Sequence, residues 1–510
     1  MPTSPDRGFF GHPSGLSTLF FTEMWERFSY YGMRALLILF MTAPLLAGGM
    51  AMPVDQAGAI YGSYTAMVYM MTIAGGWVAD KLLGFRKSVF WGGVLIMFGH
   101  ISLAIPGVAT FYSGLVLVVL GTGLLKGNIS VLVGQLYQPE DTRRDAGYSL
   151  YYMGINLGGF LGPIVCGWLA QSETFRGMLA GWGMSAGSAW HFGFGAAAVG
   201  MFFGLIQYLA GGKRLPEAAL RPPAGTTPDA TRKARGTLAK GVGALAAVVV
   251  VAIVLQGMGA IAITPTGVAA VLDGLLLVVT IGFFGWLFAA GQWTPEERKR
   301  LVVVLVLFLG AAVFWAGFEQ AGSTLNLFAE RSTDNRAFGR SYPASWFQSV
   351  NSLFIILFAP VIAWIWVRLG RRNPSSPAKF TLGLVLLASG FAVMIGAGLA
   401  SASGQLVSPM WLVLFYFLQT MGELCLSPVG LSAMSTLAPE RISGLIMGVW
   451  FLAASVGNKI AGRVGGLYES FSLPVIFAAN TVFVLVFAIV LGLLIRPIAR
   501  MLARESRKAG

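Results

Sequence analysis

Charged residues and histidine are scarce in this chain of 510 residues. Aspartate, glutamate, lysine and arginine make up 11% of it, whereas a soluble domain carries about 25%. The three histidines, His12, His100 and His191, lie far apart, which argues against a metal site and against a membrane-embedded enzyme. The sequence also lacks a G-x-x-x-x-G-K-[ST] phosphate loop, so ATP is not expected to drive the protein. We expect neither a cofactor nor a bound metal.

Cysteine is equally rare. Cys166 and Cys425 both lie in apolar stretches, where they behave as small apolar residues and give no information on redox compartment. The first fifteen residues have no basic-plus-apolar signal architecture, so the first apolar run is expected to be retained as a helix.

Long apolar runs fill the rest of the chain. Hydrophobic residues make up 56% and the mean hydropathy is +0.73, which predicts an all-α polytopic membrane protein. We predict fourteen transmembrane helices, over residues 16–42, 57–80, 88–106, 110–135, 146–171, 189–211, 241–263, 267–290, 301–328, 344–368, 379–402, 408–437, 442–469 and 474–500.

Positive charge is unevenly distributed between the loops of these spans. Of the 35 lysine and arginine residues, 26 fall on one side of the predicted membrane, 4 on the other and 5 inside spans. Because such an excess marks the cytoplasmic side, both termini are predicted to be cytoplasmic. The same excess explains the net charge of +14 without nucleic acid binding.

The longest polar stretch, residues 211–240, is rich in proline, glycine, threonine and basic residues, and we expect a flexible cytoplasmic linker there. It follows six spans. The predicted division is therefore a six-helix bundle over 1–212, the linker over 213–240, an extra transmembrane hairpin over 241–290 and a second six-helix bundle over 291–510. The hairpin contains Asp273, for which the sequence offers no explanation.

The first span carries charges along one face. At 100° per residue, Glu23, Glu26, Arg27, Tyr30 and Arg34 fall within about a third of the helix circumference. Charges at this depth are costly unless they pair and face a bundle interior or a wet cavity. The alternative is a structural ion-pair cluster that only holds helices together.

Further ions lie inside other spans, next to glycine or proline residues that thin or break a helix. They are Lys126, Glu319 and Glu423. Cations in the first half and acids in the second suit a zwitterion with separated ends, such as a short peptide. The nearby aromatic residues either form apolar pockets for substrate side chains or serve ordinary membrane packing. They are Tyr30, Tyr31, Tyr69, Trp315 and Trp450. For Lys459 and Arg463 we expect snorkelling or a contact at an outer gate.

Three motifs resemble those of known transporters. Glu23-x-x-Glu26-Arg27-Phe28-x-Tyr30-Tyr31 resembles the signature of the proton-coupled oligopeptide transporter (POT/PTR) family of the major facilitator superfamily. The segment 149–159 resembles that family's second signature, with Tyr151 in place of phenylalanine and with Asn156 expected to line a cavity. The loop 76–87 resembles the superfamily's cytoplasmic loop motif, through Gly76, Asp80, Lys81, Gly84, Arg86 and Lys87.

The resemblance implies a major facilitator fold and a proton-coupled symporter that imports di- and tripeptides by alternating access in a bacterial inner membrane. We expect a monomer. We expect Glu23, Glu26, Arg27 and Glu319 to couple protons. The residues that we expect to bind substrate are Tyr30, Tyr31, Arg34, Tyr69, Lys126, Asn156, Trp315, Asn351, Glu423 and Trp450, of which the resemblance adds Asn351 and Trp450 as cavity residues. The chain departs from the family at Ala454, where relatives have serine. The open alternative is a proton-coupled facilitator for another organic anion or a drug.

Overall fold

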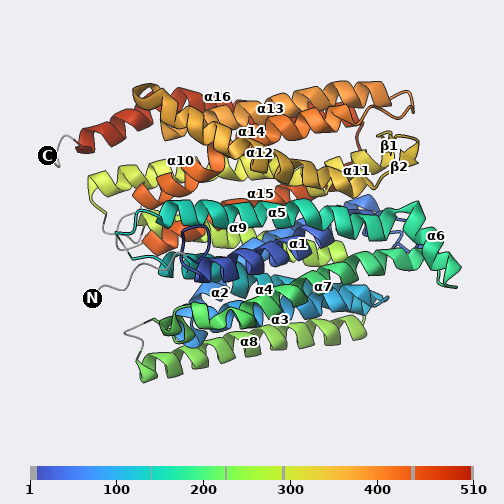
Figure 1. Ribbon diagram of the computed structural model, residues 1–510, viewed down its shortest axis with the longest axis horizontal. Helices are drawn as coiled ribbons and strands as arrows, with labels where there is room; N and C mark the ends of the chain where they lie inside the picture. The colour runs from blue at the N-terminus through green and yellow to red at the C-terminus, as the bar shows by residue number, and fades with distance from the viewer. Residues whose placement is uncertain (1–7, 139, 224–226, 290–292, 438–442, 507–510) are drawn as a thin grey trace. The chain divides into compact units, whose positions relative to one another are not determined.

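The computed structural model describes residues 8–138, 140–223, 227–289, 293–437 and 443–506, and the chain is built almost wholly of helices (Figure 1). The α-helices are α1 (Gly15–Thr42), α2 (Val54–Val78), α3 (Phe85–Ala104), α4 (Val108–Gln135), α5 (Arg144–Gln171), α6 (Glu173–Gly181), α7 (Ala189–Ala210), α8 (Pro228–Gly257), α9 (Pro265–Ala289), α10 (Pro295–Phe318), α11 (Thr324–Arg331), α12 (Phe347–Leu369), α13 (Ser376–Ser401), α14 (Met410–Leu437), α15 (Ser443–Gly466) and α16 (Leu473–Ser506).

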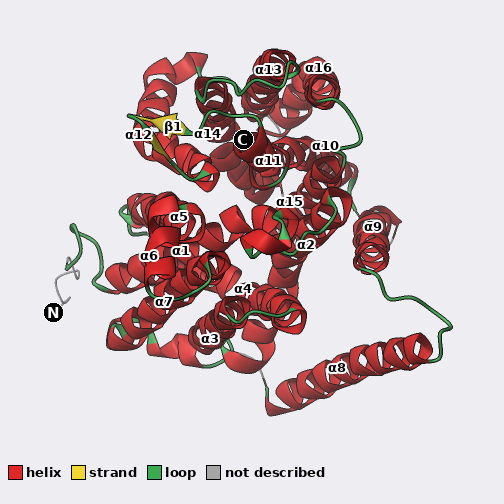
Figure 2. Cartoon of the chain, turned by 90° about the vertical axis from the view of Figure 1, so that its right-hand side faces the viewer, coloured by secondary structure: helices red, strands yellow, loops and turns green. Residues whose placement is uncertain are grey.

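Regular strands, within the described residues, are confined to one short hairpin (Figure 2). Strands β1 (Arg336–Ala337) and β2 (Arg340–Ser341) pair antiparallel, with Arg336 opposite Ser341. Phe338 and Gly339 form the turn, and both have positive φ, +51° and +75°, as a two-residue hairpin turn requires.

Membrane-spanning character extends over most of the helices. In the described part of the chain, 11 helices are long and apolar enough to cross a membrane, by length and composition. Helices α1, α2 and α15 are not among them. The charges Glu23, Glu26, Arg27 and Arg34 account for the exclusion of α1. The fold is thus an all-helical membrane architecture.

The helices form two compact units whose segments alternate along the chain. One unit comprises Met1–Tyr30, Met70–Gly158 and Phe194–Leu272, and the other comprises Tyr31–Tyr69, Gly159–Gly193 and Asp273–Gly510. Helix α1 therefore contributes to both units. Neither unit coincides with one predicted six-helix bundle, and the division of the chain into bundles stays a prediction. The predicted boundary at 290–291 lies outside the described residues.

Glycine allows close helix packing within each unit. In the first unit, a Cβ on Gly121 of α4 would lie 2.5 Å from the carbonyl oxygen of Gly92 in α3. In the second unit, a Cβ on Gly58 of α2 would lie 2.6 Å from the carbonyl oxygen of Gly462 in α15. Contacts this short exclude any side chain, so the backbones touch, as small residues permit between membrane helices.

One sequence-based expectation was wrong in detail. The flexible linker expected over residues 213–240 is helical in its second part, because α8 begins at Pro228. Thr227 accepts a hydrogen bond from the Ala230 amide and proline occupies the first turn, and together these start a helix despite the polar composition.

The span expected over 301–328 corresponds to one candidate span, Pro295–Arg331. Within it, a 3₁₀ turn at Glu319–Gly322 lies between α10 and α11.

Candidate functional site

A buried ion cluster occupies the middle of α1 in the first unit. The Nε atom of Arg27 lies 2.8 Å from Glu23 Oε1 and 2.7 Å from Glu26 Oε2. No side chain of the three is more than 3% exposed. Glu26 and Arg27 follow Glu23 by three and four residues, and these spacings place both side chains beside Glu23 on the helix surface. When fully ionised the cluster carries a net charge of −1, so one added proton would neutralise it.

An aromatic ring adjoins this cluster. The buried Tyr30 ring has the Arg27 guanidinium carbon 5.7 Å from its centroid and the Lys126 ammonium 5.9 Å from it. Lys126 comes from α4 and is half-buried. These distances fall within the range of cation–π contacts. The structure thus brings together Tyr30, Arg27 and Lys126, which are separated by up to 99 residues in sequence.

The glycine-rich segment of α5 packs against α1, next to Arg27. A Cβ on Gly158 would lie 2.9 Å from the amide nitrogen of Phe28, and one on Gly154 would lie 2.9 Å from the Phe20 ring. Asn156, between them in sequence, is buried and donates to the carbonyl oxygen of Tyr152 at 2.9 Å. The glycines therefore serve close helix packing, and the cavity role of Asn156 stays a prediction.

The second unit contains a buried ion pair at the break between α10 and α11. Arg34 Nη1 lies 2.8 Å from Glu319 Oε2, and the two side chains are 4% and 1% exposed. A Cβ on Gly322 would lie 3.1 Å from Arg34 Nε and even closer to the Tyr61 hydroxyl. Glycine at 322 therefore makes room for both side chains. The Arg34 guanidinium carbon also lies 5.5 Å from the centroid of the half-buried Tyr31 ring.

Glu423 forms a second acidic site in this unit. Its Oε2 accepts a hydrogen bond of 3.0 Å from the Asn351 amide, which also donates to Thr420 Oγ1 at 2.9 Å. Asn351 belongs to α12, whereas Thr420 and Glu423 lie one turn apart on α14. The Glu423 carboxylate accepts this hydrogen bond from a neutral amide, so Asn351 does not compensate its negative charge. Thr420 is a member of this group that the sequence did not reveal.

Aromatic residues occupy neighbouring positions in the second unit. The rings of Trp315 and Trp450 meet edge to face, 6.5 Å apart, and Phe380 meets Trp450 in the same way at 6.5 Å. Ser455 of α15, next to the divergent Ala454, donates to the carbonyl oxygen of Ala66 at 2.8 Å. That hydroxyl is therefore engaged in helix packing. Tyr69, in α2, is half-buried.

The loop motif between α2 and α3 has a conformation that only glycine adopts readily. Gly84 has φ +81° and ψ 158°, and a Cβ there would lie 2.7 Å from the Arg221 carbonyl oxygen. Arg86 donates to the carbonyl oxygen of Gly212 at 2.8 Å, which ties this loop to the segment after α7. Asp80 and Lys81 lie in a π-helical turn at Ala79–Leu83. Gly76 has open space around it, and Lys87 follows in the first turn of α3.

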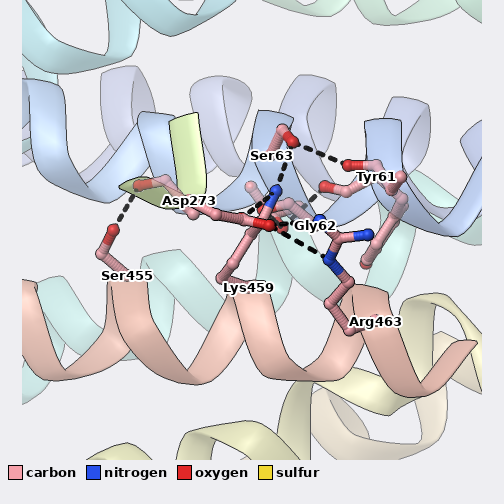
Figure 3. A network of polar contacts seen from close by, with 10 residues as sticks. Tyr61, Gly62, Ser63, Asp273, Ser455, Lys459 and Arg463 are labelled. Atoms are coloured by element: carbon pink, nitrogen blue, oxygen red, sulfur yellow. Dashed lines mark hydrogen bonds and ion pairs between the residues drawn. The ribbon is translucent and has the colours of Figure 1, made fainter. Parts of the chain in front are cut away.

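An ion network that the sequence did not predict joins three helices of the second unit (Figure 3). Asp273 of α9 contacts Lys459 and Arg463 of α15, and Lys459 also donates to Ser63 of α2. Lys459 is buried, so it does not snorkel as one of the two expectations held. Nothing in the sequence around Asp273 indicates that it pairs with residues about 190 positions away.

Comparison with known proteins gives a consistent result. The family model described as PTR2, POT family, matches residues 86–485. The peptide transporter YePEPT of Yersinia enterocolitica is 44% identical over 98% of this chain and 97% of its own length. A di-/tripeptide transporter of Lactococcus lactis subsp. cremoris is 37% identical over 98% of each chain. A crystal structure of peptide transporter POT in complex with sulfate has 43% sequence identity and a TM-score of 0.87, over 98% of this chain and 97% of that one.

Proposed function

This chain belongs to the POT family, and from that premise we propose that it couples peptide uptake to protons through the Arg34–Glu319 ion pair. The protein is a multi-pass membrane transporter of di- and tripeptides and not an enzyme. The relatives that are named peptide transporters favour a peptide over another organic anion or a drug as its substrate. Proton coupling, direction and site residues are the parts that we propose.

The observation that carries the coupling is the burial of Arg34 and Glu319 as a pair at 2.8 Å. Such a pair is strongly disfavoured when one partner is withdrawn, because the other charge is left without compensation in an apolar surrounding. A peptide carboxylate that takes Arg34 would leave Glu319 alone, and a proton would then neutralise it. Peptide binding and proton binding thus favour each other reciprocally.

The cluster around Arg27 supplies a second proposed proton site. Glu23 and Glu26 share one guanidinium, so their protonation is coupled and belongs to the pair and not to either acid. The structural alternative is that these acids only hold helices together. In that case, their removal should lower the yield of folded protein and leave coupling intact.

Peptide ends are proposed to be recognised by charge. Arg34 and Lys126 would bind the carboxylate, and Glu423 with Asn351 would bind the amine, because charge-assisted hydrogen bonds are strongest where water is sparse. The availability of the Glu423 carboxylate supports this assignment, since its partner in the structure is a neutral amide. The remaining proposed substrate-binding residues, which would line permissive pockets, are Tyr30, Tyr31, Tyr69, Asn156, Trp315 and Trp450.

The proposed architecture is that of a major facilitator transporter. It has fourteen spans, two six-helix bundles and an extra hairpin, with both termini in the cytoplasm of a bacterial inner membrane, and it works as a monomer. The two bundles would rock around a central site to give alternating access. The charge asymmetry of the loops and the eleven apolar helices support this topology.

Liposome transport tests the coupling. Glu319→Gln and Glu26→Gln should each retain exchange of labelled peptide without a net gradient, but lose accumulation driven by an imposed proton gradient. Asp229→Asn is the matched control, because its side chain is 90% exposed on α8. A dipeptide blocked at both termini should not compete for uptake. Proton-driven accumulation that persists in Glu319→Gln would refute the coupling role of this acid.

A further inference from the structure

Asp273 is the only charged residue within α9, Pro265–Ala289. A lone carboxylate in such an apolar helix is costly unless it has a partner. Its Oδ1 lies 2.6 Å from Lys459 Nζ, and its Oδ2 contacts the Arg463 guanidinium (Figure 3). One acid of the hairpin therefore pairs with two cations that lie one turn apart on α15.

The two cations depend on Asp273 to different degrees. The side chain of Lys459 is 9% exposed and that of Arg463 is 48% exposed. A long arginine side chain with that exposure can carry its charge to a polar surface. Lys459 has no such route, and its hydrogen bond of 2.6 Å to Ser63 Oγ of α2 is to a neutral hydroxyl. The buried ammonium is therefore the group that needs the carboxylate.

Lys459 lies along the contact between α2 and α15. A Cβ on Gly62 would lie 2.9 Å from the Cα atom of Gly462, and one on Gly58 would lie 2.5 Å from the amide nitrogen of Gly466. Nearer the start of α15, Ser455 Oγ donates to the carbonyl oxygen of Ala66 at 2.8 Å. The two helices thus meet along a row of close backbone contacts. Among the described residues, Lys459 is the only buried cation along this row, and its carboxylate partner Asp273 comes from α9.

We propose that Asp273 is a positioning residue for transport, which acts through Lys459 to hold α15 packed against α2. The inference rests on the alternating access proposed above, in which α2 belongs to the first bundle and α15 to the second, so that this contact must open during the cycle. Without Asp273, the packed arrangement buries the Lys459 ammonium after the loss of the carboxylate with which it is paired. The equilibrium then shifts toward arrangements in which Lys459 reaches water. The hairpin in this way sets the fraction of molecules in which the contact between α2 and α15 is closed.

Distance measurements between spin labels test this directly in the full chain reconstituted in lipid nanodiscs. The labels are placed at Leu46 and Leu467, which are exposed in the loops after α1 and α15, with Cys166 and Cys425 replaced by alanine. The wild-type protein should show a short and a long distance whose ratio changes with saturating dipeptide. Asp273→Asn should lower the ratio of short to long distance at least fivefold, which corresponds to about 1 kcal/mol.

Two comparisons separate this role from general damage. Asp229→Asn removes an exposed acid of α8, the helix that precedes α9, and should leave the ratio within twofold of wild type. Lys459→Met removes the buried cation, so adding Asp273→Asn in that background should have no further effect. This second comparison decides the matter even when Asp273→Asn alone does not yield folded protein.

The outcomes also distinguish the two proposals. A wild-type protein with one distance under every condition would overturn alternating access and this inference with it. Two distances in wild type, with an unchanged ratio in folded Asp273→Asn, would overturn only the role of Asp273. An equal shift in Asp273→Asn with and without Lys459→Met would likewise show that Asp273 does not act through Lys459.

Discussion

Replacing Gly462 with alanine is expected to separate two helices that now touch. The new Cβ would lie 2.5 Å from the amide nitrogen of Gly62 and 2.7 Å from the carbonyl oxygen of Gly58. Both are backbone atoms, so no side chain can rotate away. Since ordinary contact begins at 3.4 Å, α2 and α15 must move apart by about 1 Å, the same order as the overlaps that overpacked cores must relieve.

The size of the effect follows from two opposing contributions. Overpacking of this kind costs about 1–3 kcal/mol, whereas alanine is favoured over glycine inside a helix by about 0.5–1 kcal/mol. The net loss for the packed arrangement is therefore about 1–2 kcal/mol, a change of roughly 5–30-fold in its population. Gly282→Ala isolates the second contribution, because Gly282 lies inside α9 and nothing is within 4 Å of its Cβ position.

Thermal melting of the purified full chain, together with the label distances at Leu46 and Leu467, measures both effects. Gly462→Ala should melt below wild type and show a smaller fraction of the short distance. Gly282→Ala should melt at or above wild type and leave the distances unchanged. The reasoning is refuted if Gly462→Ala melts as high as Gly282→Ala with the wild-type distance distribution, because the backbones then cannot be in contact.

Two other predictions concern the loop between α2 and α3 and the loop between α4 and α5. Gly84→Ala should lower the melting midpoint, since a side chain at φ +81° costs about 1–3 kcal/mol and its Cβ would also meet the Arg221 backbone; a midpoint equal to that of Gly282→Ala would contradict this. Hydrogen bonds from the Arg143 side chain lower the pKa of Asp141 to about 2 from its ordinary value of 3.8. The stabilisation is therefore complete above that ordinary value and is lost as the pH falls through about 2. Asp141→Asn should thus lower the melting midpoint equally at pH 5 and pH 8, and a difference between those two values would argue against the ion pair.

Local periodicity predicted those parts of the site that lie on one helix. Glu26 and Arg27 follow Glu23 by three and four residues, so their position beside Glu23 follows from helix geometry alone. The charge and glycine pattern also singled out Arg34 and Glu319, which the structure places 2.8 Å apart. Their roles in coupling stay predictions, because geometry alone does not show proton movement.

Features that depend on which helices are neighbours could not be predicted. Asp273 and Lys459 are separated by 186 positions, and nothing in either local sequence indicates that α9 lies against α15. By contrast, the 3₁₀ turn at Glu319–Gly322 falls where the neighbouring glycine was expected to thin or break the helix. Thr227 and Pro228 carry a helix-start pattern, which prevails over the polar composition of the region.

The glycine contact between α2 and α15 limits the substitutions that this sequence can accept during evolution. In most cores a larger side chain on one helix can be accommodated by a smaller one on its neighbour. Here a Cβ on Gly58, Gly62 or Gly462 would already meet the backbone of a glycine on the other helix, and no residue is smaller than glycine. Compensating pairs of substitutions are therefore closed to these three positions. A library of random variants selected for peptide uptake should keep all three as glycine, while it admits alanine freely at Gly282.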